Sequence, residues 1–585
     1  MHYKSPLPPL PPIPETNVHD FMFSSPGLTD PADKVLLIEP LSGRRWHRDE
    51  FKERVYDAAT ALLTPVSEGG LGFAPQGEMI AIMSTNSVVS IEIPSLVTKN
   101  TRPTRGNKEF ITLVNACFRA AIPCALIPSG ATAFELEHLF RTSEASRLFV
   151  HPSLLPNALD SAHKSGVRDD RIYLLGGHIE GRTSLDAAIR EVRNRKVPRV
   201  PSRPANRDTL AYLVYSSGTS GLPKAVMVSH RNVIVNLTQV KIVTEVEGPN
   251  PIVETHPPVT LVFLPMYHSF GLHVGCIRNV WSALPTIVIP RWNADHVLDL
   301  IPKFRVSVLP MTPPAILQLV NHRRVREVDL SSLAFCGSGA AHLPPKLSNA
   351  WKALLKNVEV VAEGYGMSEC TITATVGMPK SVGSRKPGST GVLLSGMEAR
   401  IVKEDGTLAG PNEPGELWLK GQNVVSGYWR NEKATKETFA DGWLRTGDRF
   451  RIEEDGQFFF LERTKDILKV SGSQVSPTEI ENAMLAYPDR LVSDVAVAGV
   501  SGGRTSDEKV PRAWVVLSDE GHRMGERAVV KALHSWVEKN LSKYKWLRGG
   551  IEVIEEIPKN PTGKVLRRVL QERHEERLQA PQAKL

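Results

Sequence analysis

The chain has 585 residues, which is too long for a single hydrophobic core and predicts several domains or subdomains. Hydrophobic residues make up 41% of it, as in an ordinary globular protein, and the formal net charge is +8. A positive surplus suits a protein that handles small polyanions, and it would equally suit a nucleic-acid binder. Because no basic stripe is interleaved with aromatic residues, we expect no nucleic-acid partner. No uninterrupted apolar run reaches about 18 residues, so we also expect no integral membrane contact.

The cysteines and the common hydrolase motifs exclude further classes. There are five cysteines, widely spaced and without a C-x-x-C pair, which indicates buried free thiols in a reducing compartment. H-E-x-x-H does not occur, so a zinc-protease interpretation loses its usual support.

Along the chain, residues 1–33 are Pro-rich at their start and predict an extended, flexible lead. A large domain is expected over residues 34–461, where short apolar runs alternate with amphipathic stretches. This alternation predicts an α/β fold (α+β overall) with mostly parallel, doubly wound sheets and a small β subdomain. The expected strands include Met79–Met83, Ala125–Ile127, Leu148–Val150, Ile172–Leu175, Val306–Leu309, Leu333–Cys336 and Val358–Ala362, and the expected helices include Phe110–Ala120 and Ala133–Thr142.

Residues 88–109 fit this alternation poorly, because they contain the polar run T-K-N-T-R-P-T-R-G-N-K. We interpret them as an insertion that packs loosely. A surface loop and translated non-coding sequence remain two open explanations.

The most informative stretch is a hydroxyl- and glycine-rich loop between two apolar runs, Leu210–Tyr215 and Ala225–Val228. Glycines let backbone N–H groups turn toward an anion, hydroxyls add donors, and Lys224 adds charge, so the loop predicts a polyphosphate cradle. It is not a Walker loop, because Ala225 rather than Ser or Thr follows the lysine. An ordinary surface turn is the alternative. The candidate cradle residues are Ser216, Ser217, Gly218, Thr219, Ser220, Gly221 and Lys224.

The loop, Y-S-S-G-T-S-G-L-P-K, resembles the signature of the adenylate-forming superfamily: acyl-CoA synthetases, aryl-CoA ligases such as the coumarate ligases, peptide-synthetase adenylation domains and luciferases. The family usually continues with glycine, where this chain has Ala225. Further motifs follow in the family's order, so the resemblance covers nearly the whole chain from about residue 34.

Two of these motifs concern the acyl group. His268 and Phe270 follow an apolar run, where a packed core histidine is as good an explanation from the residues alone. The resemblance implies that His268 lies beside the acyl carboxylate and that Phe270 lines the acyl pocket. It also implies that the turn Gly337–Ala341, through Gly339 and Ala340, packs against the adenine and the acyl group.

The stretch Glu363–Glu369 matches the family's G-Y-G-x-[TS]-E. The resemblance implies that Tyr365 stacks near adenine, that Ser368 meets the phosphate and that Glu369 binds Mg2+, a cation held by carboxylate and phosphate oxygens. The same resemblance adds Glu363, Gly364 and Gly366 to the nucleotide site and Gly366, Ile372 and Thr373 to the acyl pocket. Asp448, in W-x-x-T-G-D, would accept hydrogen bonds from both ribose hydroxyls, although an exposed aspartate in a turn is usually only a turn former.

A small, mobile α+β C-terminal domain is expected over residues 462–577. The resemblance places the hinge at Glu462, where the family more often has Asp, and gives Arg463 to the nucleotide site. A capped helix is predicted from Thr478. The resemblance further assigns Ser471 and Gly472 to coenzyme A, Lys465, Lys469 and Gln474 to the acyl pocket, and Lys564, in P-K-N-P-T-G-K, to adenylation.

The resemblance implies an AMP-forming acyl- or aryl-CoA ligase that uses ATP, Mg2+ and coenzyme A, with Lys564, His268, Glu369 and Thr219 as catalytic residues. Its carboxylate substrate would attack the α-phosphorus of ATP, and a thiol would then displace AMP. A stand-alone adenylating enzyme, serving a carrier protein or a luciferase-like oxidation, is the alternative. Coumarate ligases tend to have Pro-Val where Ile372 and Thr373 stand, which speaks against a hydroxycinnamate.

Residues 578–585 form a tail that ends in Ala583-Lys584-Leu585. A small, a basic and an aliphatic residue at a free C-terminus resemble the S-K-L peroxisomal address. We therefore expect recognition by the peroxisomal import receptor, with an arbitrary exposed tail as the alternative and a cytoplasmic location otherwise.

Overall fold

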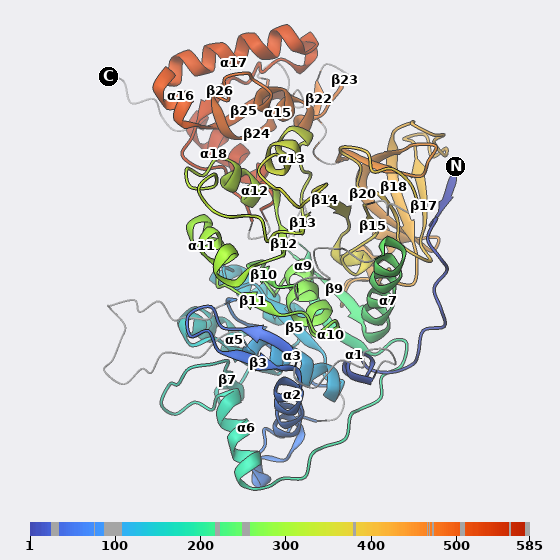
Figure 1. Ribbon diagram of the computed structural model, residues 1–585, viewed down its shortest axis with the longest axis vertical. Coiled ribbons are helices and arrows are strands. Elements are labelled where there is room, and N and C mark those ends of the chain that lie inside the picture. Colours follow the sequence, from blue (N-terminus) through green and yellow to red (C-terminus); the bar gives the residue numbers. More distant parts are fainter. Residues whose placement is uncertain are drawn as a thin grey trace.

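The computed structural model describes residues 1–24, 34–74, 77–86, 108–216, 223–248, 258–377, 382–464, 466, 468–470, 473–502, 509–560 and 563–579. Two large sheets with helices around them form the body, a smaller β sheet lies beside them, and the C-terminal part lies at one end (Figure 1). The expected α/β fold with a β subdomain and a smaller C-terminal part is confirmed. None of the helices described is long and apolar enough to cross a membrane. The proposed insertion lies almost entirely outside the described residues, because 87–107 are not among them.

The first large sheet has the strand order β7-β6-β4-β5-β8-β9 and is parallel except where β8 pairs with β9. Every residue of β4, β5 and β6 is buried, as expected for strands covered on both faces. Its elements are β4 (Ile80–Met83), α3 (Lys108–Ala120), β5 (Cys124–Ile127), α4 (Ala133–Ser143), β6 (Arg147–Val150), α5 (Leu155–Lys164), β7 (Ile172–Leu174), α6 (Leu185–Asn194), β8 (Leu210–Ser216), β9 (Lys224–Ser229) and α7 (His230–Glu247).

The second large sheet has the order β16-β15-β14-β13-β12-β10-β11-β2-β3. Its elements are β2 (Val35–Ile38), β3 (Arg45–His47), α2 (Arg48–Leu63), β10 (Thr260–Val262), α9 (Ser269–Leu272), α10 (Asn279–Trp281), β11 (Thr286–Val288), α11 (Ala294–Phe304), β12 (Val308–Met311), α12 (Pro313–Val320), β13 (Phe335–Ser338), α13 (Pro345–Lys352), β14 (Ala362–Tyr365), β15 (Thr375–Val376) and β16 (Val392–Leu393). The strand expected at Val358–Ala362 is wrong for all but its last residue, because Val358 and Val361 are buried in irregular chain before β14.

The expectation of a flexible lead is wrong for residues 1–24. Strand β1 (His2–Lys4) pairs antiparallel with β17 (Glu398–Val402), and the N-terminal ammonium donates to the carbonyl of Ala409 at 2.7 Å. Leu7 and helix α1 (Val18–Ser24) also bury apolar side chains against the body. The proline pattern does not show these long-range partners, which hold the segment in place.

The smaller sheet has the order β1-β17-β18-β20-β19, with β21 also paired to β20. It contains β18 (Gly415–Lys420), α14 (Glu432–Thr438), β19 (Phe439–Ala440), β20 (Trp443–Ile452) and β21 (Phe458–Arg463).

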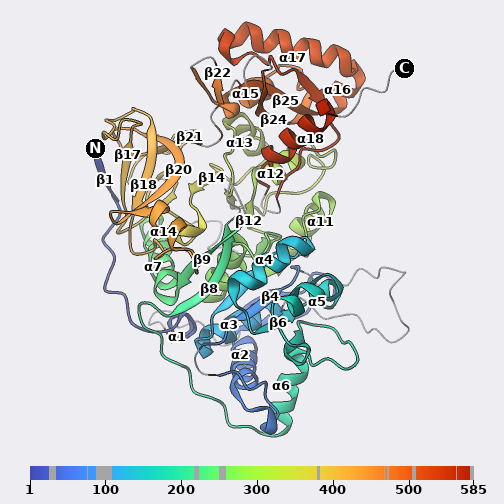
Figure 2. The same cartoon turned by 180° about the vertical axis from the view of Figure 1, so that it is seen from behind.

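The C-terminal part has a hydrophobic core of its own, built from residues such as Val470, Ile480, Val497, Val515 and Leu533. Figures 1 and 2 both show it beyond α12 and α13. The capped helix expected near Thr478 is present, with Ser476 accepting from the Glu479 amide. The elements are β22 (Leu468–Val470), β23 (Ser473–Val475), α15 (Pro477–Leu485), β24 (Val492–Ser501), β25 (Lys509–Leu517), α16 (Asp519–Met524), α17 (Glu526–Asn540), β26 (Ile551–Val553) and α18 (Arg567–Gln579).

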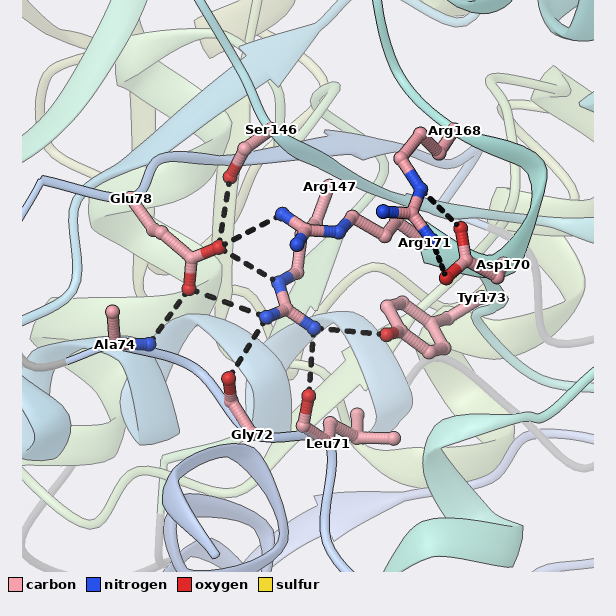
Figure 3. Close-up of polar contacts among 10 residues, drawn as sticks. All are labelled: Leu71, Gly72, Ala74, Glu78, Ser146, Arg147, Arg168, Asp170, Arg171 and Tyr173. Carbon is pink, nitrogen blue, oxygen red and sulfur yellow. Dashed lines mark hydrogen bonds and ion pairs between the residues drawn. The ribbon is translucent and has the colours of Figure 1, made fainter. Parts of the chain in front are cut away.

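A polar network fixes the beginning of the first large sheet (Figure 3). The Arg147 guanidinium donates to the Glu78 carboxylate at 3.2 Å, to the carbonyls of Leu71 and Gly72, and to the Tyr173 hydroxyl. Side-chain exposure is 7% for Arg147 and 15% for Glu78, so this is a largely buried charge pair with nearly all its donors satisfied. Such a pair is costly to break from one side only.

Candidate active site

A cleft of about 1100 Å³ separates the C-terminal part from the body. Residues of the body that line it include Glu363, Gly364, Tyr365, Gly366, Ala340, Asp448 and Arg463, and the C-terminal part contributes Gly563 and Lys564. Eight candidate residues from five separate motifs, together with Gly563, therefore meet around one space.

Asp448 is the most deeply buried acid of this cleft, with an exposed fraction of 1%. Its Oδ2 accepts a hydrogen bond from the Tyr365 hydroxyl at 2.7 Å, and its Oδ1 lies 3.3 Å from Arg463 Nε. Burial raises the pKa of Asp448 above its ordinary value, while the Arg463 charge opposes that rise. The carboxylate is thus oriented by two neighbours.

Lys564 reaches the cleft on a tight hairpin of the C-terminal part. The Asn560 side chain accepts from the Lys564 amide at 2.8 Å, and the Asn560 amide donates to the Lys564 carbonyl at 2.9 Å. Gly563 has φ +85°, a backbone conformation that glycine adopts more easily than other residues. An added Cβ there would also lie only 3.1 Å from Pro314 Cγ, so glycine is favoured for steric reasons as well. The hairpin therefore approaches α12 closely.

The environment of Lys564 lowers its pKa to about 8, through burial first and the Arg463 charge second. Asp466 and Asp448 oppose this shift because they are negative. A lysine with this pKa is still mostly protonated at neutral pH, so it carries a poorly solvated positive charge into the cleft.

The glycine-rich loop is described only at its ends. Ser216 and Lys224 are cross-strand partners in β8 and β9, and the Lys224 ammonium lies 4.9 Å from the Tyr428 ring centroid. The intervening candidates, Ser217, Gly218, Thr219, Ser220 and Gly221, lie outside the described residues. The strand–loop–strand setting is present, and the cradle itself stays a prediction.

Glu369 is not among the residues that line this cleft, and its exposed fraction is 4%. Its Oε1 accepts a hydrogen bond from the Tyr428 hydroxyl at 2.8 Å, and burial raises its pKa. The neighbouring Ser368 hydroxyl lies 2.9 Å from the Ser269 hydroxyl. Tyr428 was not singled out for the site from the sequence, because only the fold brings it to Glu369.

The acyl-side candidates form a second group. His268 Nε2 is buried with no partner among the described residues, and burial lowers the His268 pKa to about 4, so its imidazole is neutral at physiological pH. An added Cβ on Gly339 would lie 3.1 Å from Phe270 Cε1. Ala340 has φ +71°, a left-handed conformation that costs a non-glycine residue free energy and is often found at functional sites.

Comparison with known proteins identifies the family of this chain. A family model described as an AMP-binding enzyme matches residues 106–429, and a second, described as the AMP-binding enzyme C-terminal domain, matches residues 479–564. The chain belongs to the AMP-binding enzyme family. The resemblance to the adenylate-forming superfamily is thereby confirmed.

This AMP-binding enzyme is an acid–thiol ligase. Several of its relatives carry names that describe the same enzyme class. Acyl-CoA synthetase 7 of Caenorhabditis elegans is 32% identical over 80% of this chain and 85% of its own length. 4-Coumarate–CoA ligase 1 of Arabidopsis thaliana is 34% identical over 62% of this chain and 63% of its own length. Among solved structures, ATP-bound MatB from Rhodopseudomonas palustris has a TM-score of 0.76 and 27% identity, covering 96% of this chain and 99% of that one.

Of the remaining candidates of the AMP-binding enzyme, some are described in the structure and others lie outside the described residues. Ile372 has φ +76° and follows Thr371 with φ +52°, and the Ile372 carbonyl lies only 1.7 Å from where a Cβ on Gly366 would stand. The 371–373 turn therefore backs directly onto the cleft-lining Gly366. Lys469 and Gln474 are backbone register partners in the pairing of β22 with β23. Lys465, Ser471 and Gly472 lie outside the described residues.

Glu462 lies in β21 rather than in a loop. It pairs with Arg449 of β20 in the sheet register, and its Oε1 accepts from Arg449 Nη1 at 3.0 Å. Its role as a hinge stays a prediction.

Proposed function

We propose that this protein activates a carboxylic acid with ATP, forming acyl-AMP and pyrophosphate, and then transfers the acyl group to the thiol of coenzyme A. The observation that carries the proposal is the position of Lys564, which the C-terminal hairpin presents to the same cleft as Asp448, Tyr365 and Arg463. The names of the relatives support it as well.

In the first half-reaction, Asp448 would accept hydrogen bonds from the ribose hydroxyls. Lys564 Nζ would neutralise charge that develops on the α-phosphate as the carboxylate oxygen attacks. A preorganised donor aimed at developing charge is among the strongest catalytic devices. In the cleft, the burial that lowers the pKa of Lys564 also strengthens its interaction with a phosphate.

Mg2+ would be held by Glu369 together with phosphate oxygens of the nucleotide. The donor type fits, because Glu369 is a buried carboxylate that Tyr428 orients through Oε1, and carboxylate oxygens are the ligands that Mg2+ prefers. The described residues contain no group of three His, Cys, Asp or Glu side chains suited to a metal, so most ligands would come from the nucleotide and water. When bound, the ion would offset phosphate charge.

In the second half-reaction, the thiol would attack the acyl carbonyl and AMP would leave with its electron pair. His268 is neutral and has a free buried nitrogen, so it could hold the thiol proton or orient the carbonyl. Ser471 and Gly472 stay our candidates for contact with coenzyme A, and a rotation at or just after Glu462 would take Lys564 out of the cleft.

The test is a pyrophosphate-release screen over a panel of carboxylic acids, with and without coenzyme A. We expect acid-dependent pyrophosphate release, with AMP release that depends on coenzyme A. Lys564→Ala should lose most acyl-AMP formation and retain thioester formation from supplied acyl-AMP. AMP release that ignores coenzyme A would favour delivery of acyl-AMP to another acceptor, and no pyrophosphate release with any acid would refute the proposal.

We also propose a peroxisomal location, which rests on the tail Ala583-Lys584-Leu585 alone. A reporter fused to the last ten residues should collect in peroxisomes. A reporter ending in a scrambled version of the same ten residues is the matched control, and a diffuse signal from both would refute the address.

A further inference from the structure

Arg278 contacts the turn formed by residues 371–373, which belongs to the predicted acyl pocket. Its Nη2 donates to the Thr373 hydroxyl at 2.9 Å and to the Asn236 side-chain oxygen of α7 at 2.8 Å. Thr373 follows Ile372, whose carbonyl closes on the cleft-lining Gly366. The guanidinium is therefore separated from the cleft by a single turn of chain.

No carboxylate among the described residues pairs with Arg278. Other arginines set deep in the structure have such a partner: Arg54 pairs with Glu109, Arg147 with Glu78, and Arg567 with Glu481. Besides Asn236 and Thr373, the Tyr212 hydroxyl and the His273 imidazole lie near Arg278, and burial lowers the pKa of Arg278 to about 10. An interior cation without a counter-ion is an expensive arrangement for a fold to keep.

The group around Arg278 is rich in unused donors. Arg278 Nε and Asn236 Nδ2 are both buried without a hydrogen-bond partner in the described part of the chain. Arg278 itself keeps accessible surface, although Cys276, Ile277 and Asn279 beside it are buried. Unused N–H donors gathered around a cation are complementary to an oxygen anion.

The local backbone is unusual at the same place. Residues 273–278 form one π-helical turn that ends at Arg278. Single π-helical turns inside helices are rare and frequently occur at functional sites. This π-helical turn directly continues α9, which begins after His268. Arg278 and the acyl-pocket candidate His268 are therefore on one continuous helical segment.

We propose that Arg278, with Asn236 and Thr373, binds a second carboxylate at the far end of the acid substrate. This inference rests on the proposed acid activation and adds its substrate class: acids with a distal carboxylate are preferred over apolar acids of equal length. A planar guanidinium suits this role because it offers paired donors to a carboxylate. Arg278 acts as a specificity residue, since the reacting carboxyl lies at the other end of the substrate.

The experiment compares pyrophosphate release from straight-chain α,ω-dicarboxylates, each paired with the monocarboxylate of the same length, and from 4-carboxyphenylacetate paired with phenylacetate. For the wild-type protein we expect kcat/KM to be at least tenfold higher for one or more of the dicarboxylates than for its partner. Arg278→Met should remove or reverse that preference, and Arg278→Lys should keep part of it. The affinity for ATP should stay unchanged in both variants.

The outcomes separate the inference from the proposed function. Wild-type turnover that favours the monocarboxylates, or a preference that Arg278→Met leaves intact, overturns the inference while acid activation stands. Absence of turnover with every acid overturns both. If Arg278→Met does not fold, as judged by thermal unfolding, the wild-type preference and the Arg278→Lys ratio decide.

Discussion

The pKa of Lys564 yields a sharp prediction about the first half-reaction. With a pKa of about 8, roughly 90% of Lys564 is protonated at pH 7 and roughly 10% at pH 9 in the free enzyme. If adenylation needs the ammonium form, kcat/KM for ATP should fall about tenfold over that interval, because this constant reports the free enzyme. Bound phosphates stabilise the ammonium, so the fall in kcat should come at a higher pH.

The assay is pyrophosphate release at limiting ATP across pH 6.5 to 10, with saturating acid. Lys564→Arg should keep its charge over this range, so its alkaline fall should disappear while its overall rate drops from altered geometry. Lys564→Ala should lose about 10²- to 10³-fold, as expected for one preorganised donor. Thioester formation from supplied acyl-AMP should lack this alkaline fall.

Lys543→Ala, which changes an exposed lysine of the C-terminal part, is the control and should reproduce the wild-type profile. The reasoning would be refuted by a wild-type profile that stays flat from pH 7 to 10. It would be refuted equally by an alkaline fall that survives in Lys564→Arg.

Three further predictions concern other parts of the structure. Asp448→Asn should raise the dissociation constant for ATP at least tenfold, measured by calorimetry, because the acceptor loses its charge; an unchanged affinity would contradict the ribose contact. Tyr428→Phe removes a hydrogen bond that lowers the pKa of Glu369, so the acidic limb of the activity profile should move to higher pH and half-activation should need more Mg2+. Glu78→Gln should lower the free energy of unfolding by about 3 kcal/mol, measured in urea, because it leaves the buried Arg147 without its counter-ion. The affinity for ATP should stay unchanged. A loss below about 1 kcal/mol, the value for an exposed ion pair, would refute this.

The sequence predicts much of the first large sheet because local signals there agree with the fold. Apolar runs such as Leu148–Val150 are buried on both faces and lie within observed strands, and Thr132 caps α4 with a reciprocal hydrogen bond to Glu135. The lead fails because its order comes from pairing between His2 and Arg400, a contact that no local pattern encodes. The strand expected at Val358–Ala362 fails because a buried apolar run also fits irregular chain.

The candidate site also contains residues that the sequence predicts and residues that only the fold reveals. Motif residues such as Tyr365, Asp448 and Lys564 come together because each family motif carries its own turn to the cleft. Tyr428 and Arg278 lack such a motif: they meet Glu369 and Thr373 across 59 and 95 residues of chain. A charge without a partner is visible only when its neighbours are known.

The sheet register also bears on the movement that we propose between the two half-reactions. Asp448 pairs with Arg463 at the end of the β20–β21 ladder, one residue past the expected hinge at Glu462. A rotation at Glu462 would break that last pair and displace Arg463 from Asp448. A rotation after Arg463 would keep the ladder and still withdraw Lys564, so conserving these hydrogen bonds favours a pivot at the turn that begins with Thr464.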